Sequence, residues 1–173
     1  ESLRKETLVM DSIQLIKWAM SKLNSIILDK PPPPIMLKRI SDIFARKNED
    51  GDGPLHCAIL NEMHDQLKQM LLVLGKGPNR VTINERNKKN ETVLHLAVVQ
   101  NQPEIVKILL AFGCDPNIAN NEGNTALHLA IMNNSHECIN ELLSTSNNFR
   151  HSIPLDYNLS NYDGWTPLHT ATR

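Results

Sequence analysis

Several features that mark whole classes of protein are absent from this sequence of 173 residues. No apolar run approaches the roughly 18 residues that a membrane-spanning helix needs, so we expect no transmembrane segment. The three cysteines are too few and too widely spaced for a disulfide framework, and no CxxC pair occurs, which favours an intracellular protein with reduced thiols. A glycine-rich phosphate loop is also missing, and no Ser/His/Asp or paired-carboxylate pattern is evident. An enzyme is therefore disfavoured.

Charge is distributed unevenly along the chain, although the formal net charge is only −1. Residues 1–47 hold nine Lys/Arg against five Asp/Glu, whereas residues 48–173 hold nine against fourteen. A basic leader thus precedes an acidic remainder. Because the first residue is not Met and the last repeated unit is incomplete, we expect the sequence to be a fragment of a longer protein.

One short motif occurs four times. Thr-x-Leu-His-x-Ala begins at Thr92, at Thr125 and again at Thr166 (TPLHTA), and a version with Gly in place of Thr occurs at 53–58 (GPLHCA). The four motif histidines, separated by 39, 33 and 41 residues, are His56, His95, His128 and His169. A unit of 33 residues, here with insertions of six and eight, is the period of ankyrin repeats, each a β-turn followed by two helices. We therefore expect an all-α ankyrin-repeat solenoid with β-hairpin turns.

The motif residues have local roles at the start of each first helix. Thr92, Thr125 and Thr166 are predicted N-caps, because a threonine hydroxyl can accept a hydrogen bond from an unpaired amide of the first helical turn. Pro54 and Pro167 are predicted at the first helical position, where a missing N–H costs nothing. Such short helices are unstable alone, so the repeats must stack on one another.

The repeat that starts near residue 87 shows the expected helix pair most clearly. Leu94, Ala97 and Val98 recur at helical spacing and predict one apolar face on the first helix. The second helix is predicted to begin at Pro103, and Gly113 is expected to end it as a C-terminal cap.

The leader contains a predicted amphipathic helix, since apolar residues from Val9 to Ile27 recur at spacings of three and four. Its broad apolar face favours packing in a protein core over binding to a membrane. Trp18 falls on the polar side, where it is either a contact residue for a partner or a chance surface aromatic. The prolines at 31–34 must end the helix, and without the flanking base of SH3 ligands they favour a stiff elbow over a recognition motif.

These patterns predict three regions. They are an amphipathic helix and proline elbow at 1–34, a capping helix at 35–47, and ankyrin repeats at 48–173, divided as 48–86, 87–119, 120–160 and a partial 161–173.

The four aligned histidines could indicate a metal site or a structural role. With one histidine in each repeat, successive imidazoles are expected on separate layers about 10 Å apart, whereas zinc ligands must converge within about 2 Å of one ion. We therefore expect no metal, no cofactor and no catalytic residue, and we expect each histidine to bond its own threonine and nearby backbone.

From Asn48 onward the chain resembles IκB proteins and the ankyrin halves of NF-κB precursors more than arbitrary ankyrin repeats. The stretches that carry this resemblance are NEDGDGPLHCAI (48–59), NQPEIVKILLAFGCDPN (101–117), GNTALHLA (123–130) and NYDGWTPLH (161–169). Departures from the family pattern are Gly53 for the capping Thr, Val93 and Ala126 for Pro, and Glu62, Asn101 and Asn134 for the inter-helix Gly. The predicted leader helices favour a Relish-type precursor over a freestanding inhibitor of the Cactus or IκB type.

The resemblance implies a protein-binding scaffold in innate immune signalling. Its implied partner is the Rel homology domain of an NF-κB transcription factor, in cis or in trans, with the basic nuclear localisation segment masked so that the factor stays in the cytoplasm until processing admits it to the nucleus. An acidic array suits such a basic partner. We expect no direct nucleic acid, membrane or small-molecule substrate.

Two other functions stay open at this point. The chain could be an unrelated ankyrin-repeat adaptor or a viral IκB mimic, and recovery of Rel proteins in a pull-down would separate these from the inhibitor. An enzyme would need polar side chains converging from distant positions in a closed pocket, which solenoids rarely supply.

Ankyrin proteins bind through their turn tips and the inner face of their first helices, so residues expected to point outward there are the predicted partner contacts. These are Glu49, Asp50, Asp52, Lys88, Lys89, Glu91, Asn121, Glu122, Asn124, Tyr162, Asp163 and Trp165, with Trp18 from the leader. Asp50 and Asp52 are predicted to bind basic residues, and Trp165 is predicted to be an aromatic anchor. For each charge the alternative is that it only solvates a turn.

Overall fold

The computed structural model describes residues 45–74, 83–145 and 153–172, together with Gln14, Lys17, Ser21 and Asp42. Gln14, Lys17 and Ser21 are helical and exposed, at positions where the sequence predicts the leader helix. Trp18, the proline run and most of the expected capping helix lie outside the described residues. The chain divides into two compact units, Glu1–Val81 and Thr82–Arg173. In the described part of the chain, no helix is long and apolar enough to span a bilayer.

The first unit contains one described helix pair. Helix α4 (Pro54–Leu60) packs against α5 (His64–Leu74), and both lie in the predicted repeat 48–86. Pro54 opens α4 as predicted, with Gly53 as the N-cap in an extended conformation. Ile59, Leu67 and Met70 are fully buried and form the apolar contact between the helices.

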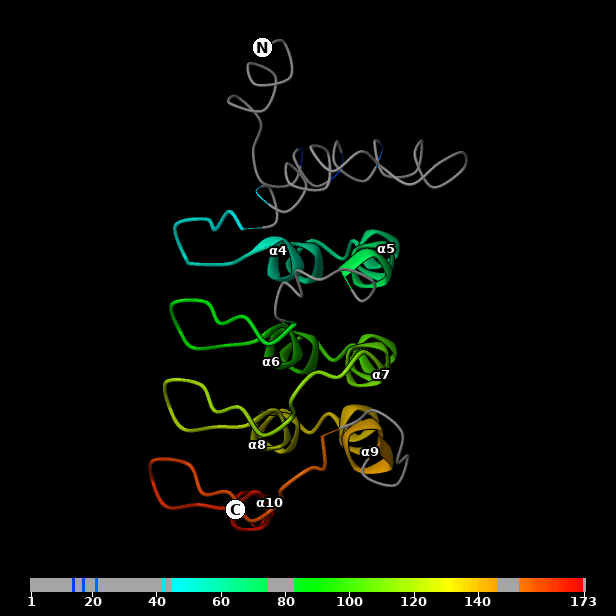
Figure 1. The fold of residues 1–173 in the computed structure, drawn as a ribbon. Coiled ribbons are helices and arrows are strands. Elements are labelled where there is room, and N and C mark those ends of the chain that lie inside the picture. Colours follow the sequence, from blue (N-terminus) through cyan, green and yellow to red (C-terminus); the bar gives the residue numbers. More distant parts are fainter. Residues whose placement is uncertain are drawn as a thin grey trace. The chain divides into compact units, whose positions relative to one another are not determined.

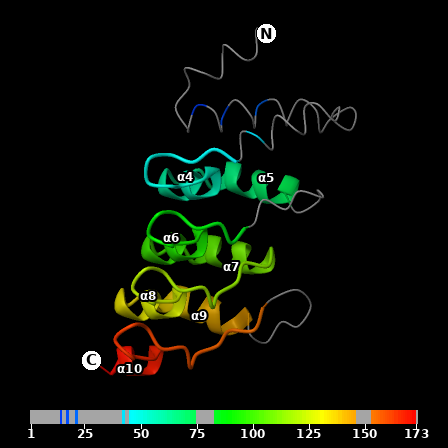
Figure 2. The ribbon, with the colours of Figure 1, turned by 60° about the vertical axis from the view of Figure 1, so that its left-hand side comes forward.

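The second unit contains five helices in layers. They are α6 (Val93–Val99), α7 (Pro103–Ala111), α8 (Ala126–Met132), α9 (His136–Thr145) and α10 (Pro167–Ala171). Helices α6, α8 and α10 pack in succession, α7 packs against α9, and the turns before α6, α8 and α10 project on one side (Figures 1 and 2). This arrangement confirms the predicted all-α ankyrin fold. The predicted hairpins are tight turns, because no strand occurs among the described residues.

The core of the second unit follows the periodicity of the sequence. Leu94, Ala97 and Val98 are buried in α6, and Leu109 of α7 and Leu142 of α9 are fully inaccessible. Burial of one such leucine stabilises the fold by about 1.5–3 kcal/mol. Since each helix is short, most of its stability must come from packing against adjacent helices.

The turns inside the helix pairs show why the family usually has glycine at three positions where this chain has another residue. Glu62, Asn101 and Asn134 have φ of 54°, 52° and 52°, in the left-handed region that glycine adopts most easily. Asn tolerates this region better than Glu, because its short side chain bonds locally. Gly113 has φ of 86° after α7, which confirms it as the residue that ends that helix.

Candidate protein-binding surface

The motif histidines link each N-cap to the helix that follows it. His95 Nδ1 accepts the Thr92 backbone N–H at 3.1 Å and lies 2.9 Å from the Thr92 hydroxyl. His128 makes the same pair of contacts with Thr125, at 3.2 and 2.9 Å. Each histidine occupies the third helical position, where a capping box usually has Glu or Gln. The predicted pairing of a histidine with its own threonine is confirmed for His95 and His128, whereas His56 has no such threonine and accepts the backbone N–H of Gly53 at 3.3 Å.

Thr92, Thr125 and Thr166 are the N-caps of α6, α8 and α10, as predicted, and each forms a capping box with the histidine three residues later. Thr166 accepts the His169 amide N–H at 3.4 Å, as expected of an N-cap. All three hydroxyls lie 2.8–2.9 Å from Nδ1 of the motif histidine. Because Nδ1 is an acceptor, each hydroxyl can donate its O–H to the ring while its lone pairs face the amides of the first turn.

The same histidines also reach into the next layer, which was not predicted. His95 Nε2 lies 3.2 Å from the carbonyl oxygen of Asn124, and His128 Nε2 lies 2.9 Å from that of Trp165. Because Nδ1 accepts an N–H, we place the proton on Nε2, which donates to the carbonyl. Burial lowers the pKa of His95 below its usual value, since the charged ring would lose its water.

This bonding leaves neither nitrogen of His95 or His128 for a metal ion. Among the residues that the structure describes, no group of three His, Cys, Asp or Glu side chains is placed to hold one. The geometry of these two side chains therefore supports a structural role. Each ring is hydrogen-bonded both to the N-cap residue of its own helix and to the backbone of the following turn.

An asparagine that the sequence reading missed organises the turn before each of α4, α6, α8 and α10. Asn48, Asn87, Asn120 and Asn161 each use Oδ1 to accept the backbone N–H groups two and four residues later. These eight bonds are 2.8–3.1 Å long. A signal was present, because each asparagine precedes a motif histidine by eight residues. The turns are therefore built as uniformly as the helices.

The three turns of the second unit, 87–91, 120–124 and 161–165, form what we call the turn row. Asn121 donates its backbone N–H to the Lys89 carbonyl at 3.0 Å, and Tyr162 donates to the Glu122 carbonyl at 3.2 Å. Asn161 Nδ2 also donates to Asn124 Oδ1 at 3.0 Å. Hydrogen bonds therefore join each turn of the turn row to the next one.

The structure places the predicted contact residues in three environments. Those that are exposed are Glu49, Asp50, Lys88, Lys89, Asn121, Glu122, Tyr162 and Asp163. Glu91 and Trp165 are partly buried. Trp18 lies outside the described residues. The role of each in partner binding stays a prediction.

The expectation that Asp52 and Asn124 point outward is wrong. Asp52 is only 5% exposed, and its carboxylate accepts Asn48 Nδ2 at 3.3 Å. Asn124 is 3% exposed and donates its side-chain N–H to Glu122 Oε2 at 2.9 Å. The Asp52 side chain is thus bonded within its own turn, whereas Asn124 is bonded both to Glu122 in its own turn and to Asn161 in the next one.

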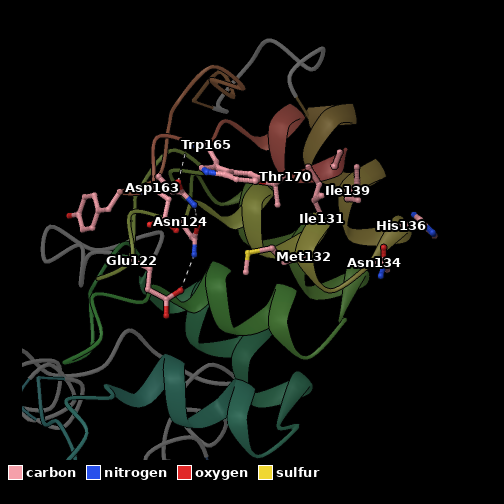
Figure 3. A pocket seen from close by; sticks show the side chains of 13 residues that line it. Glu122, Asn124, Ile131, Met132, Asn134, His136, Ile139, Asp163, Trp165 and Thr170 are labelled. Carbon is pink, nitrogen blue, oxygen red and sulfur yellow. Dashed lines mark hydrogen bonds between the residues drawn. The ribbon is translucent and has the colours of Figure 1, made fainter. Parts of the chain in front are cut away.

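A hollow of about 910 Å³ in the second unit gathers several of the predicted contacts (Figure 3). Glu122, Asn124, Tyr162, Asp163 and Trp165 all line it. The remaining lining residues come from α8, α9, α10 and the adjoining turns, and they are Ile131, Met132, Asn134, His136, Ile139, Asn161, Thr170 and Ala171. Figure 3 shows the Trp165 ring across the hollow, with Glu122 and Asp163 toward the turns and Met132 on the helix side.

The first helices contribute an exposed apolar position that the sequence reading also missed. Leu60, Val99 and Met132 are the last residues of α4, α6 and α8, and they are 43%, 48% and 54% exposed. The motif offsets place these three at the same position of each repeat. In the second unit, Val99 and Met132 therefore leave apolar surface accessible on two consecutive first helices.

The turn row is not uniformly acidic, contrary to what the overall charge suggested. Lys88 and Lys89 are exposed on the turn 87–91. Glu122 and Asp163 are exposed on the next two turns. The sign of the charge therefore changes along the turn row, from basic at the first turn to acidic at the second and third.

The cysteines take no part in this surface. Cys57, Cys114 and Cys138 are free and buried. Burial raises the pKa of all three thiols, and nearby carboxylates add to the effect. Protonated, enclosed thiols are poor nucleophiles.

Comparison with known proteins links this geometry to a family. A family model described as "Ankyrin repeats (3 copies)" matches residues 33–120, 55–154 and 100–173. The crystal structure of the ankyrin repeat domain of Bcl-3, described there as a unique member of the IkappaB protein family, is similar with a TM-score of 0.61 and 34% identity. That match covers 71% of this chain and 51% of the Bcl-3 chain.

Curated relatives point the same way. Human NF-kappa-B inhibitor alpha is 38% identical over 125 residues, covering 72% of this chain and 38% of the relative. Mouse B-cell lymphoma 3 protein homolog is 34% identical over 126 residues, covering 73% of this chain and 27% of the relative. Rat nuclear factor NF-kappa-B p105 subunit is 40% identical over 74 residues, covering 42% and 8%. The chain thus spans well under half the length of these relatives, and none of their names is that of an enzyme.

Proposed function

Because the chain belongs to the ankyrin-repeat family and is similar to its IκB members, we propose that it binds and inhibits a Rel/NF-κB transcription factor. The partner surface would be the Rel homology domain and the basic nuclear localisation segment that follows it. Covering that segment would hold the factor in the cytoplasm, in innate immune signalling.

The observation that carries this proposal is the similarity to human NF-kappa-B inhibitor alpha over 125 residues, a length comparable to the three complete and one partial predicted repeats. The described surface is compatible with it. Asp50, Glu122 and Asp163 are exposed on turns, where they can attract a Lys/Arg-rich segment before contact. Met132 and Trp165 add apolar area to the same face as the last two turns.

The layered construction supports binding without large rearrangement. Turns that are bonded to each other and to buried histidines lose little conformational freedom when a partner arrives. The entropic cost of binding would then come mainly from ordering the partner's basic segment and not from ordering the turns.

Affinity capture with purified components tests the proposal. The full chain is immobilised and offered a Rel homology protein with its basic segment, and a matched protein whose basic segment is replaced by Gly/Ser. We expect retention of the first, weaker retention of the second, and an affinity for the first that falls as salt increases. Failure to retain either would reject the proposed inhibitor and favour an unrelated ankyrin-repeat adaptor.

Joining the two proteins in one chain separates inhibition in cis from inhibition in trans. If inhibition in cis operates, the fused Rel protein binds a localisation-segment antibody less well than the free Rel protein does. Equal antibody binding by both would leave inhibition in trans as the only form of the proposal.

A further inference from the structure

The hollow beside the last two turns combines an apolar floor with carboxylates at its edge. Ile131, Met132 and Trp165 supply apolar surface, and Met132 is 54% exposed. Glu122 and Asp163 are exposed on the turns that border it (Figure 3). Among the described residues that line the hollow, none is Lys or Arg. Its chemistry therefore suits an apolar group next to a positive charge and opposes an anion.

The backbone of this hollow is fixed before any ligand arrives. Trp165 donates its N–H to Asn161 Oδ1 at 3.0 Å, and its carbonyl accepts His128 Nε2 at 2.9 Å. Asn124 is held in the same way, with its carbonyl bonded to His95 Nε2 at 3.2 Å. The buried histidines are thus positioning residues for two of the residues that line the hollow. A hollow whose backbone is preformed binds at a smaller entropic cost than one whose backbone must first be ordered.

We propose that this hollow binds one apolar side chain of an extended peptide whose neighbouring residues are Lys or Arg. The apolar side chain contacts Trp165 and Met132, and the basic residues contact Glu122 and Asp163. This inference deepens the proposed function, because it names the pattern within the partner's basic segment that the second unit recognises.

Charge complementarity selects this occupant over the alternatives. A nucleic acid or an anionic lipid would bring negative charge to two exposed carboxylates, which repel it. A purely apolar peptide would bring no positive charge to those carboxylates, although it could still contact Trp165. Only an apolar residue beside a base uses both parts of the hollow.

Fluorescence of Trp165 tests the proposal directly. Replacement of Trp18 by Phe leaves Trp165 as the sole tryptophan of the full chain. The probes are three short peptides that carry Leu-Lys-Arg, Ser-Lys-Arg or Leu-Gln-Gln in an otherwise identical Gly/Ser sequence. We expect the first to change the Trp165 emission and to bind about ten-fold more tightly than either of the others.

Matched variants locate the binding within the chain. Met132→Gln keeps the side-chain length but removes its apolar character, and the pair Glu122→Gln and Asp163→Asn removes the edge charges. Each change should weaken the Leu-Lys-Arg peptide about ten-fold, and the charge pair should also flatten its salt dependence. The controls Tyr157→Ser and Glu137→Gln alter exposed residues that do not line the hollow, and they should have no effect.

The outcomes also separate this inference from the proposed function. Equal binding of all three peptides, no change in Trp165 emission, or equal effects of the hollow and control variants would overturn the inference. If the Rel protein is nevertheless captured, the proposed inhibitor survives without this hollow. If the peptides behave as expected but no Rel protein is captured, the inference stands and the identity of the partner is wrong.

Discussion

Two layers of the second unit carry the same motif in different surroundings. In α8 the motif residues Leu127 and His128 are 3% and 0% exposed, because α10 and its turn pack over them. In α10, the last helix of these 173 residues, the matching Leu168 is 74% exposed and His169 is also exposed. The local hydrogen bonds of the two histidines to their threonines are nevertheless alike. The motif builds the helix start by itself, and a neighbouring layer determines how much the motif stabilises the fold.

The largest expected contrast is between the two leucines. Leu127→Ala should lower the free energy of unfolding by about 2–5 kcal/mol, since it removes a buried side chain and leaves a cavity. Leu168→Ala should cost less than about 0.5 kcal/mol, because its side chain is mostly in water. Urea unfolding of the full chain, followed by circular dichroism, measures both. Equal losses would show that the surroundings of the two layers do not differ as described.

The second-largest contrast in stability is expected between substitutions of His128 and His169. His128→Leu leaves the Thr125 N–H and the Trp165 carbonyl without their partner, at a cost of about 2–3 kcal/mol. His169→Leu affects a group that water can replace, so we expect a loss below about 1 kcal/mol. Thermal unfolding measures the stability of both variants. An equal loss of stability in the two would show that the bond from His128 to the Trp165 carbonyl adds nothing to the fold.

These comparisons also show what the sequence could and could not predict. Pro103 and Gly113 bracket α7 as predicted, because helix ends depend on local backbone preferences. The bond from His95 to Asn124 was missed, since it joins residues 29 apart and depends on how layers stack. Asp52 was misplaced because an acidic turn residue was assumed to face water, whereas Asn48 draws its carboxylate inward.

Two glycines in equivalent turns give the third contrast. Gly123 and Gly164 have φ of 79° and 80°, so alanine at either position is strained by about 1 kcal/mol. A Cβ on Gly123 would also lie 2.6 Å from the Tyr162 backbone nitrogen, whereas nothing lies within 4 Å of one on Gly164. Gly123→Ala should therefore destabilise the fold by about 2 kcal/mol or more, and Gly164→Ala by about half as much. Differential scanning calorimetry measures the stability loss of each variant. Equal losses for Gly123→Ala and Gly164→Ala would show that the turns are not closely packed at Gly123.

The smallest expected effect is the loss of folding stability at acid pH that results from protonation of His95. Burial holds its folded pKa below the unfolded value of about 6.5, so the unfolded chain binds the proton more tightly. The stability of the neutral ring is complete above that unfolded value and is lost as pH falls through the folded pKa. Within this window the loss is at most about 1.4 kcal/mol per pH unit. His95→Gln should reduce the slope of stability against pH, and an unchanged slope would rule out this contribution.

Hydrogen exchange of the full chain, with and without a bound Rel protein, tests the central claim that the turn row and the first helices form the partner surface. We predict slower exchange in peptides covering 87–91, 120–124 and 161–165 and in α6, α8 and α10, with little change in α7. Protection confined to α7 and α9, with the turn row unaffected, would contradict the account.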